Sequence, residues 1–323
     1  MKISFTRFVA ALAAGGFLIL AAAVDTAAAA VPAELQGTIR LWASPQDTAL
    51  VEKWEAGFRK QYPHVEFKNT WHGPESTLAG VYTDVADVAL MAREIRRPVE
   101  VMAFQWVFQY APFAVSVANA GFSAERASAQ LAFFVHADNP LSRITFAQLG
   151  HVLGAASDPA RIWGDLDVDG AWKTQPLHVI GPPVDSTDAL YLRDTVLKGN
   201  RKWNPAYDER ADTAQILAAF AKDANAISYL PVNAVPANAK VLAVGNTDDF
   251  AKPDAETTRS GRYPLTRTID IVINRPPNAA IRSPLRDFLE FVLSAQGQAL
   301  IAPSDGLVAL NDVAAQRQRE RLQ

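Results

Sequence analysis

Short strand-like runs alternate with amphipathic segments along this chain, and the alternation limits the folds that it can adopt. In the first part, residues 37–43, 64–69 and 85–91 are β-rich, alternating or continuously apolar. Residues 48–62 carry large apolar side chains at intervals of three or four, and residues 75–82 are predicted to begin a second helix. Strands that alternate with helices in this way favour a mostly parallel sheet covered by helices.

The same rhythm continues towards the end of the chain. Further strands are predicted at 130–136, 177–180, 226–230, 240–244 and 269–274. Further helices are predicted at 145–149, 188–197, 213–221 and 284–300. Thr145 is the expected N-cap of the first of these helices, and Lys198-Gly199 is a C-terminal signal for the second.

The first thirty residues have the layout of a secretory signal peptide. Lys2 and Arg7 precede an apolar run at 8–24, and small residues at 27–30 offer a cleavage site. The alternative is a membrane anchor, but the run is at the short end of what spans a bilayer. We therefore expect residues 1–30 to be a cleaved signal peptide and the mature protein to be periplasmic.

Composition excludes several classes of function. The formal net charge of −3 lacks the basic excess that a nucleic-acid partner requires. The chain has no cysteine, so it offers no site for lipidation at the cleavage point. The five histidines show no metal-ligand spacing, and no nucleophile elbow or phosphate-binding Walker loop occurs. We therefore expect no enzymatic activity, no cofactor and no metal.

A series of short motifs, taken in order, resembles one known family. Each motif is weak alone, and together they run through the mature chain: residues 134–141, Trp163-Gly164, Gly181, residues 226–229, 261–267, 288–298 and 305–310. In this order they resemble the phosphate-type solute-binding proteins of bacterial ABC importers.

The resemblance implies an α/β fold of the two-lobe periplasmic binding protein type, with mixed, mostly parallel sheets joined by two hinge crossings. Lobe one would comprise residues 31–118 and 262–323, and lobe two residues 119–261. The aromatic cluster of Trp106, Phe108, Tyr110 and Phe113 would pack near the first crossing. Solute would lie between the lobes, at strand ends and helix N-termini.

The resemblance also places two ligand loops in the first lobe. Ser44 falls on a ligand serine in the loop after the first strand, where Asp47 or Thr48 offers an alternative role as helix cap. Ser76 and Thr77 fall near the second loop and could donate to an oxyanion. Glu75 stands beside them, and its carboxylate would stabilise a helix start but repel phosphate.

Two further loops complete the set. Arg93 follows the strand at 85–91 and could place two hydrogen bonds on an anion, or could pair with Glu94 or another carboxylate. Ser186 and Thr187 fall on the fourth loop, where helix capping is an equally good explanation. Asp185 and Asp188 stand beside them, so fewer donors and more carboxylates face the ligand than the family pattern has.

The function predicted from the resemblance is an exported protein that traps a small anionic solute, phosphate or another oxyanion. Its partner would be an inner-membrane ABC permease, and the protein would act as a monomer. The alternative is an exported sensor or accessory interaction protein that uses the same fold without binding phosphate.

Overall fold

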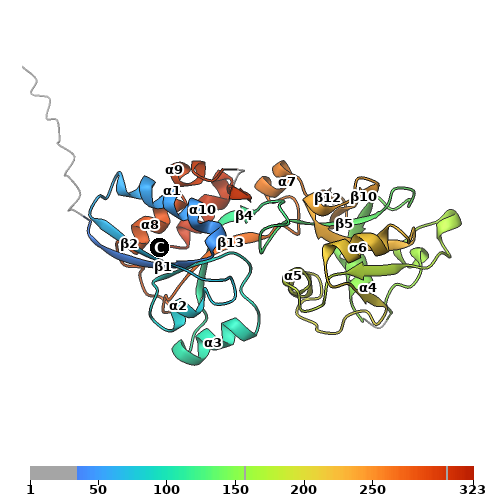
Figure 1. Ribbon diagram of the computed structural model, residues 1–323, viewed down its shortest axis with the longest axis horizontal. Coiled ribbons are helices and arrows are strands. Elements are labelled where there is room, and N and C mark those ends of the chain that lie inside the picture. Colours follow the sequence, from blue (N-terminus) through green and yellow to red (C-terminus); the bar gives the residue numbers. More distant parts are fainter. Residues whose placement is uncertain (1–34, 156–157, 303–304) are drawn as a thin grey trace, which may run out of the picture. The chain divides into compact units, whose positions relative to one another are not determined.

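The computed structural model describes residues 35–155, 158–302 and 305–323, so the predicted signal peptide lies outside the described residues. Two large sheets organise this part of the chain (Figure 1). The first sheet has six strands in the order β14 (Leu307–Val308), β4 (Phe113–Ala120), β13 (Thr268–Ile273), β3 (Val88–Met91), β1 (Gly37–Ala43) and β2 (Val65–Trp71). No helix among the described residues is long and apolar enough to span a bilayer.

The first sheet is mixed. β1 pairs in parallel with both β2 and β3, whereas β13 runs antiparallel to β3 and to β4. Because β1 and β3 are parallel neighbours, the loops that follow Ala43 and Met91 emerge at the same edge of the sheet. Ligands of open α/β sheets bind at this carboxyl edge.

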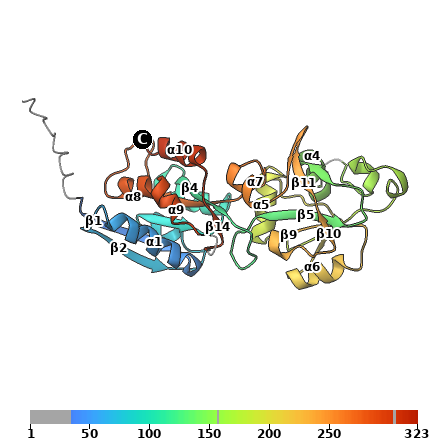
Figure 2. The same ribbon diagram turned by 90° about the horizontal axis from the view of Figure 1, so that it is seen from above.

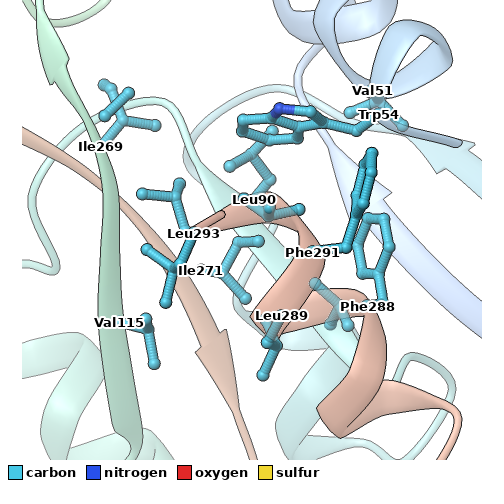
Figure 3. Close-up of a cluster of buried hydrophobic side chains, with 14 of the residues drawn as sticks. Val51, Trp54, Leu90, Val115, Ile269, Ile271, Phe288, Leu289, Phe291 and Leu293 are labelled. Carbon is cyan, nitrogen blue, oxygen red and sulfur yellow. The ribbon is translucent and has the colours of Figure 1, made fainter. Parts of the chain in front are cut away.

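Helices bury one face of this sheet in a continuous apolar core. Side chains from α1 (Thr48–Arg59) and α8 (Leu285–Val292) meet strand residues such as Leu90 and Ile271. Figure 3 shows the aromatic side chains of α8 pointing towards Trp54 of α1. The other helices that follow first-sheet strands are α2 (Ala79–Tyr82), α3 (Val99–Phe108), α9 (Ala295–Ala299) and α10 (Asp312–Glu320), with a 3-10 turn, η1, at Pro45–Asp47.

Two helices differ from the sequence prediction. The helix predicted at 75–82 is reduced to α2, and turns at 74–78 precede it. The single helix predicted at 284–300 is divided into α8 and α9, because Ser294 ends the run and caps α9 by accepting a hydrogen bond from the Gly297 amide. The close approach of Gly297 to the backbone of α8 requires glycine, since a Cβ would lie 2.1 Å from the Phe291 oxygen.

The second large sheet has the strand order β10 (Ala239–Val241), β5 (Leu131–His136), β9 (Ala226–Pro231), β7 (His178–Gly181) and β8 (Tyr207–Glu209). β5 therefore lies between β10 and β9, and Figure 2 shows the three strands close together. A smaller sheet joins β12 (Asp249–Ala251), β11 (Ala243–Asn246) and β6 (Arg143–Thr145). The helices of this region are α4 (Phe146–Leu153), α5 (Thr187–Thr195), α6 (Thr213–Phe220) and α7 (Ala255–Ser260), with 3-10 turns η2 (Trp163–Leu166), η3 (Gly170–Trp172) and η4 (Val232–Ala234).

Local capping signals in this region are used as predicted. The side chain of Thr145 accepts a hydrogen bond from the Gln148 amide, and Gln148 bonds back to the Thr145 amide, which completes a capping box. The predicted N-cap is therefore confirmed.

The chain passes between the two sheets twice, after β4 and again before β13. Buried Gln130 links these two segments, because its amide nitrogen donates to the Ala120 oxygen and its amide oxygen accepts from the Arg267 backbone nitrogen. The Tyr263 hydroxyl donates to the Leu131 oxygen at 2.6 Å. The lobe limits at 118 and 262 remain a prediction.

Candidate functional site

The loops at the carboxyl ends of β1 and β3 hold the first predicted ligand residues. Ser44 follows β1 directly and is buried, and its backbone oxygen accepts a hydrogen bond from the Asp47 amide. Its hydroxyl caps no helix. Ser44 is therefore positioned by its backbone.

Arg93 follows β3 and is buried between two carboxylates. Its guanidinium donates to Glu100 at 2.7 and 3.0 Å and to Glu75 at 3.1 and 3.4 Å, and also to the Glu94 oxygen at 2.8 Å. Glu100 lies on α3, one turn beyond the loop, and it also accepts from the Arg96 amide at 2.7 Å. The positive charge of Arg93 is thus already balanced within the protein.

The second predicted loop offers hydroxyl groups that bind their own turn. The Ser76 and Thr77 hydroxyls both lie within hydrogen-bonding distance of the Gly73 oxygen, at 3.3 and 3.2 Å. Thr77 is fully buried, whereas Ser76 is exposed. Ser76 is therefore the more accessible of the two.

The fourth predicted loop opens α5. Ser186 is the N-cap, and its hydroxyl accepts a hydrogen bond from the Ala189 amide at 3.2 Å, so the capping explanation describes its present contact. Thr187 is the first residue of the helix. Asp188, which replaces a ligand threonine in the family pattern, is turned towards Arg267.

Arg267 forms a buried ionic junction that the sequence patterns did not indicate. Its guanidinium donates to Glu94 at 2.7 and 2.8 Å and to Asp188 at 2.6 Å, and it stacks over the Tyr191 ring at 4.7 Å. Burial alone lowers the pKa of Arg267, but the two carboxylates outweigh it and raise that pKa. Burial raises the pKa of Asp188, against the opposing effect of Arg267. In the sequence Arg267 ends the motif at 261–267 and stands just before the predicted strand at 269–274, but neither signal indicated its partners.

A second buried pair joins Asp47 to Arg126. Both side chains are buried, and Arg126 also donates to the Asp305 backbone oxygen at 2.8 Å. Burial raises the pKa of Asp47, and Arg126 opposes this shift. Asp47 stands at the N-cap position of α1, as the capping alternative expected, but its side chain makes no capping hydrogen bond and pairs with Arg126 instead.

Two hollows border these residues. One, of about 190 Å³, is lined by Arg93, Arg96 and Thr187 among others, so it brings together predicted ligand residues from two loops. Because a water molecule takes up about 30 Å³ of liquid, this hollow has room for a small solute. Ser186 and Thr187 line another hollow of about 250 Å³ together with Asp188 and Asp212. Ser44, Ser76 and Thr77 line neither of them.

The predicted aromatic cluster is wrong for two of its four members, Trp106 and Phe113, and Phe113 packs instead against the core below α1 and α8. Phe108 and Tyr110 do pack, with Phe104, in a small apolar cluster beside β3. Trp106 does not join them, because it lies on the outer face of α3 and is 77 % exposed. The turn of α3 places Trp106 on a different face of the helix from Phe104 and Phe108, and the sequence analysis predicted no helix there.

Asp270 of β13 gives a testable pH dependence. Its Oδ1 atom has no hydrogen-bond partner among the described residues, and burial raises its pKa despite contacts with Ser116 and Thr268. The folded state therefore retains this proton to higher pH than the unfolded state does. The free energy of unfolding should fall as pH rises from the unfolded pKa of 3.8 to the raised folded pKa, by about 1.4 kcal/mol for each pH unit between the two values.

Urea unfolding of the wild type and of Asp270→Asn across roughly pH 4 to 8 measures this dependence. The variant should lose stability less steeply with rising pH than the wild type does. Parallel curves for the two proteins would show that Asp270 ionises normally in the folded state. Asp47, Glu55 and Asp188 also have raised pKa values from burial and contribute with the same sign to both curves.

Comparison with known proteins identifies the family. A family model described as the PBP superfamily domain matches residues 28–296 of this chain. The chain belongs to the PBP superfamily. A curated relative, the phosphate-binding protein PstS of Pseudomonas aeruginosa, is 26 % identical to this PBP-superfamily protein over 81 % of the chain and 79 % of the relative.

Solved structures support the same assignment at the level of fold. PstS from Borrelia burgdorferi matches 85 % of this PBP-superfamily protein and all of its own chain, with a TM-score of 0.59 at 14 % identity. An ABC-type phosphate transport receptor from Vibrio cholerae matches 84 % and 99 %, with a TM-score of 0.55 at 16 % identity. The predicted α/β fold class and the resemblance to phosphate-type binding proteins are confirmed. The expectation of mostly parallel sheets is wrong, because six of the eleven strand pairings among the described residues are antiparallel.

Proposed function

We propose that this PBP-superfamily protein is an exported solute-binding protein of an ABC importer, which traps a small anionic solute between its lobes. The observation that carries the proposal is the gathering of Arg93, Arg96 and Thr187 around one hollow at the carboxyl edge of β3. Relatives named as phosphate-binding proteins support it. The solute would shift the population of the protein from open to closed lobes, and no chemical step would take place. The closed form would be presented to an inner-membrane permease.

The proposed ligand groups are those expected from the resemblance: Ser44, Ser76, Thr77, Arg93, Ser186 and Thr187. Their present contacts suggest weak binding of phosphate. Arg93 is bound to two carboxylates, and the Ser186 hydroxyl already accepts a hydrogen bond from the backbone. A dianion entering this site must compete with these internal partners, because removing an oxyanion from water is costly unless donors replace the water.

Thermal unfolding of the mature protein with and without solutes tests the proposal. The panel contains millimolar phosphate, sulfate and uncharged or amine-bearing small solutes. We expect at least one solute to raise the midpoint temperature of unfolding. At a thousandfold excess of solute over its dissociation constant, binding adds about 4 kcal/mol to the free energy of unfolding. Phosphate should give a modest rise only. No rise with any solute would contradict the importer function.

A second function, that of an exported accessory protein, is favoured by the outer face of α3. Val99, Met102, Trp106 and Val107 are all exposed there, and the one charged residue of the helix, Glu100, turns inward to Arg93. A neighbouring hollow of about 500 Å³ is lined by Arg97, Lys198 and Arg201, which make no ion pair among the described residues. This surface would suit a partner protein with apolar and acidic side chains, because Trp, Met and Arg are enriched in interface cores. It becomes the better explanation if no solute stabilises the fold.

A further inference from the structure

The carboxylate of Glu75 lies between two guanidinium groups. Arg93 donates to it through Nε and Nη2, at 3.4 and 3.1 Å. Arg96 approaches the same two oxygens through Nη2 at 3.0 Å and Nη1 at 2.5 Å. Two arginine forks that converge on two oxygens are an arrangement suited to a carboxylate or phosphate group.

Glu75 is not needed to balance the buried charge of Arg93. Glu100 already binds Arg93 through two short hydrogen bonds, and its side chain is only 13 % exposed. The four side chains of Arg93, Arg96, Glu75 and Glu100 together carry no net charge. If Glu75 moved away, the group would carry one positive charge, while buried Arg93 would keep its carboxylate partner.

Glu75 is also free to move. Its side chain is 56 % exposed and extends from a turn before α2, whereas the Arg93 side chain is buried. Because the Glu75 carboxylate is exposed, water can replace the hydrogen bonds that it accepts when the side chain turns away from Arg93 and Arg96. Arg93 and Arg96 also line the hollow of about 190 Å³, which has room for a small solute beside them.

We infer that Glu75 is a tethered competitor, which occupies an oxyanion subsite formed by the Nε edge of Arg93 and the guanidinium of Arg96. A tetrahedral oxyanion binds there only when it displaces the Glu75 side chain. Glu75 thereby sets the specificity of the site, because it opposes free oxyanions and leaves the rest of the pocket open to other solutes. This inference deepens the proposed function and rests on it for the location of the solute.

Titration calorimetry with inorganic phosphate at low ionic strength tests the inference. Glu75→Gln keeps the size of the side chain and removes its negative charge, so phosphate affinity should rise by at least about tenfold over the wild type. Arg96→Gln, added to Glu75→Gln, should abolish the gain. The matched control is Glu290→Gln, which removes another exposed carboxylate, 43 % exposed and 3.8 Å from Arg286, and should leave affinity unchanged.

An unchanged or lower phosphate affinity in folded Glu75→Gln would overturn the inference, as would an equal gain in Glu290→Gln. Glu75→Ala provides a second variant should the glutamine protein fail to fold, and the same rise is expected from it. The result is separable from the proposed function. If Glu75→Gln binds phosphate and the wild type binds no solute, the role of Glu75 as a competitor is supported and the importer function is rejected. If the wild type binds a solute and Glu75→Gln gains no phosphate affinity, the importer function is supported and the role of Glu75 as a competitor is rejected.

Discussion

Replacement of Arg267 by alanine is expected to lower the free energy of unfolding by about 3–5 kcal/mol. The side chain is completely buried, and its removal leaves the carboxylates of Glu94 and Asp188 without the guanidinium that they share. It also removes the stacking over Tyr191 and a hydrogen bond to the Ala129 oxygen. Urea unfolding at neutral pH, followed by circular dichroism, measures the loss.

The control for this variant is Arg286→Ala. Arg286 is half exposed, and its nearest carboxylate atoms are 3.5 and 3.8 Å away, so the change should be within about 0.5 kcal/mol. A further variant combines Arg267→Met with Glu94→Gln and Asp188→Asn. It should recover much of the stability, because replacing every charge of a buried cluster is far less damaging than removing one. A loss below about 1 kcal/mol in Arg267→Ala would mean that water reaches the junction.

Replacement of Phe288 by alanine should cost about 3–5 kcal/mol. Phe288 lies on the buried face of α8 (Figure 3). Its ring packs against the rings of Phe58 and Phe67, with centroid distances of 5.5 and 5.1 Å. The variant would remove most of a ring from the centre of the first core and leave a cavity that rigid neighbours cannot fill. The same urea experiment measures the effect.

Two comparison variants define the cause of this loss. Phe288→Leu retains much of the buried volume and should cost clearly less than the alanine variant. Val313→Ala removes an exposed apolar side chain from α10 and should change stability by no more than about 0.5 kcal/mol. Similar losses for the alanine and leucine variants would show that the shape of the ring, and not the cavity, decides stability at this position.

Local sequence patterns predicted many individual elements. The apolar spacing along 48–62 became α1, and the alternation at 269–274 became β13. Thr145 was predicted as an N-cap because threonine is favoured there, and the structure added the reciprocal bond from Gln148 that completes a capping box. Predictions failed where distant packing decided the outcome. The break between α8, which ends at Val292, and α9, which Ser294 caps, is an example, because it brings Gly297 close to a backbone oxygen of α8, which periodicity cannot reveal.

The candidate site also has features that local sequence patterns predicted and features that only distant packing decided. The sequence by itself determined which residues stand at the strand ends, among them Ser44 and Arg93, because strand ends are set by local patterns. It also showed that Glu75 and Asp188 replace the residues expected in the family. Only the tertiary structure decided which charges meet: Glu75 and Glu100 on Arg93, Asp188 and Glu94 on Arg267. The physical reason is that ion pairing depends on distances of a few ångströms, and Glu94 and Arg267 are 173 residues apart in the sequence and 2.7 Å apart in the fold.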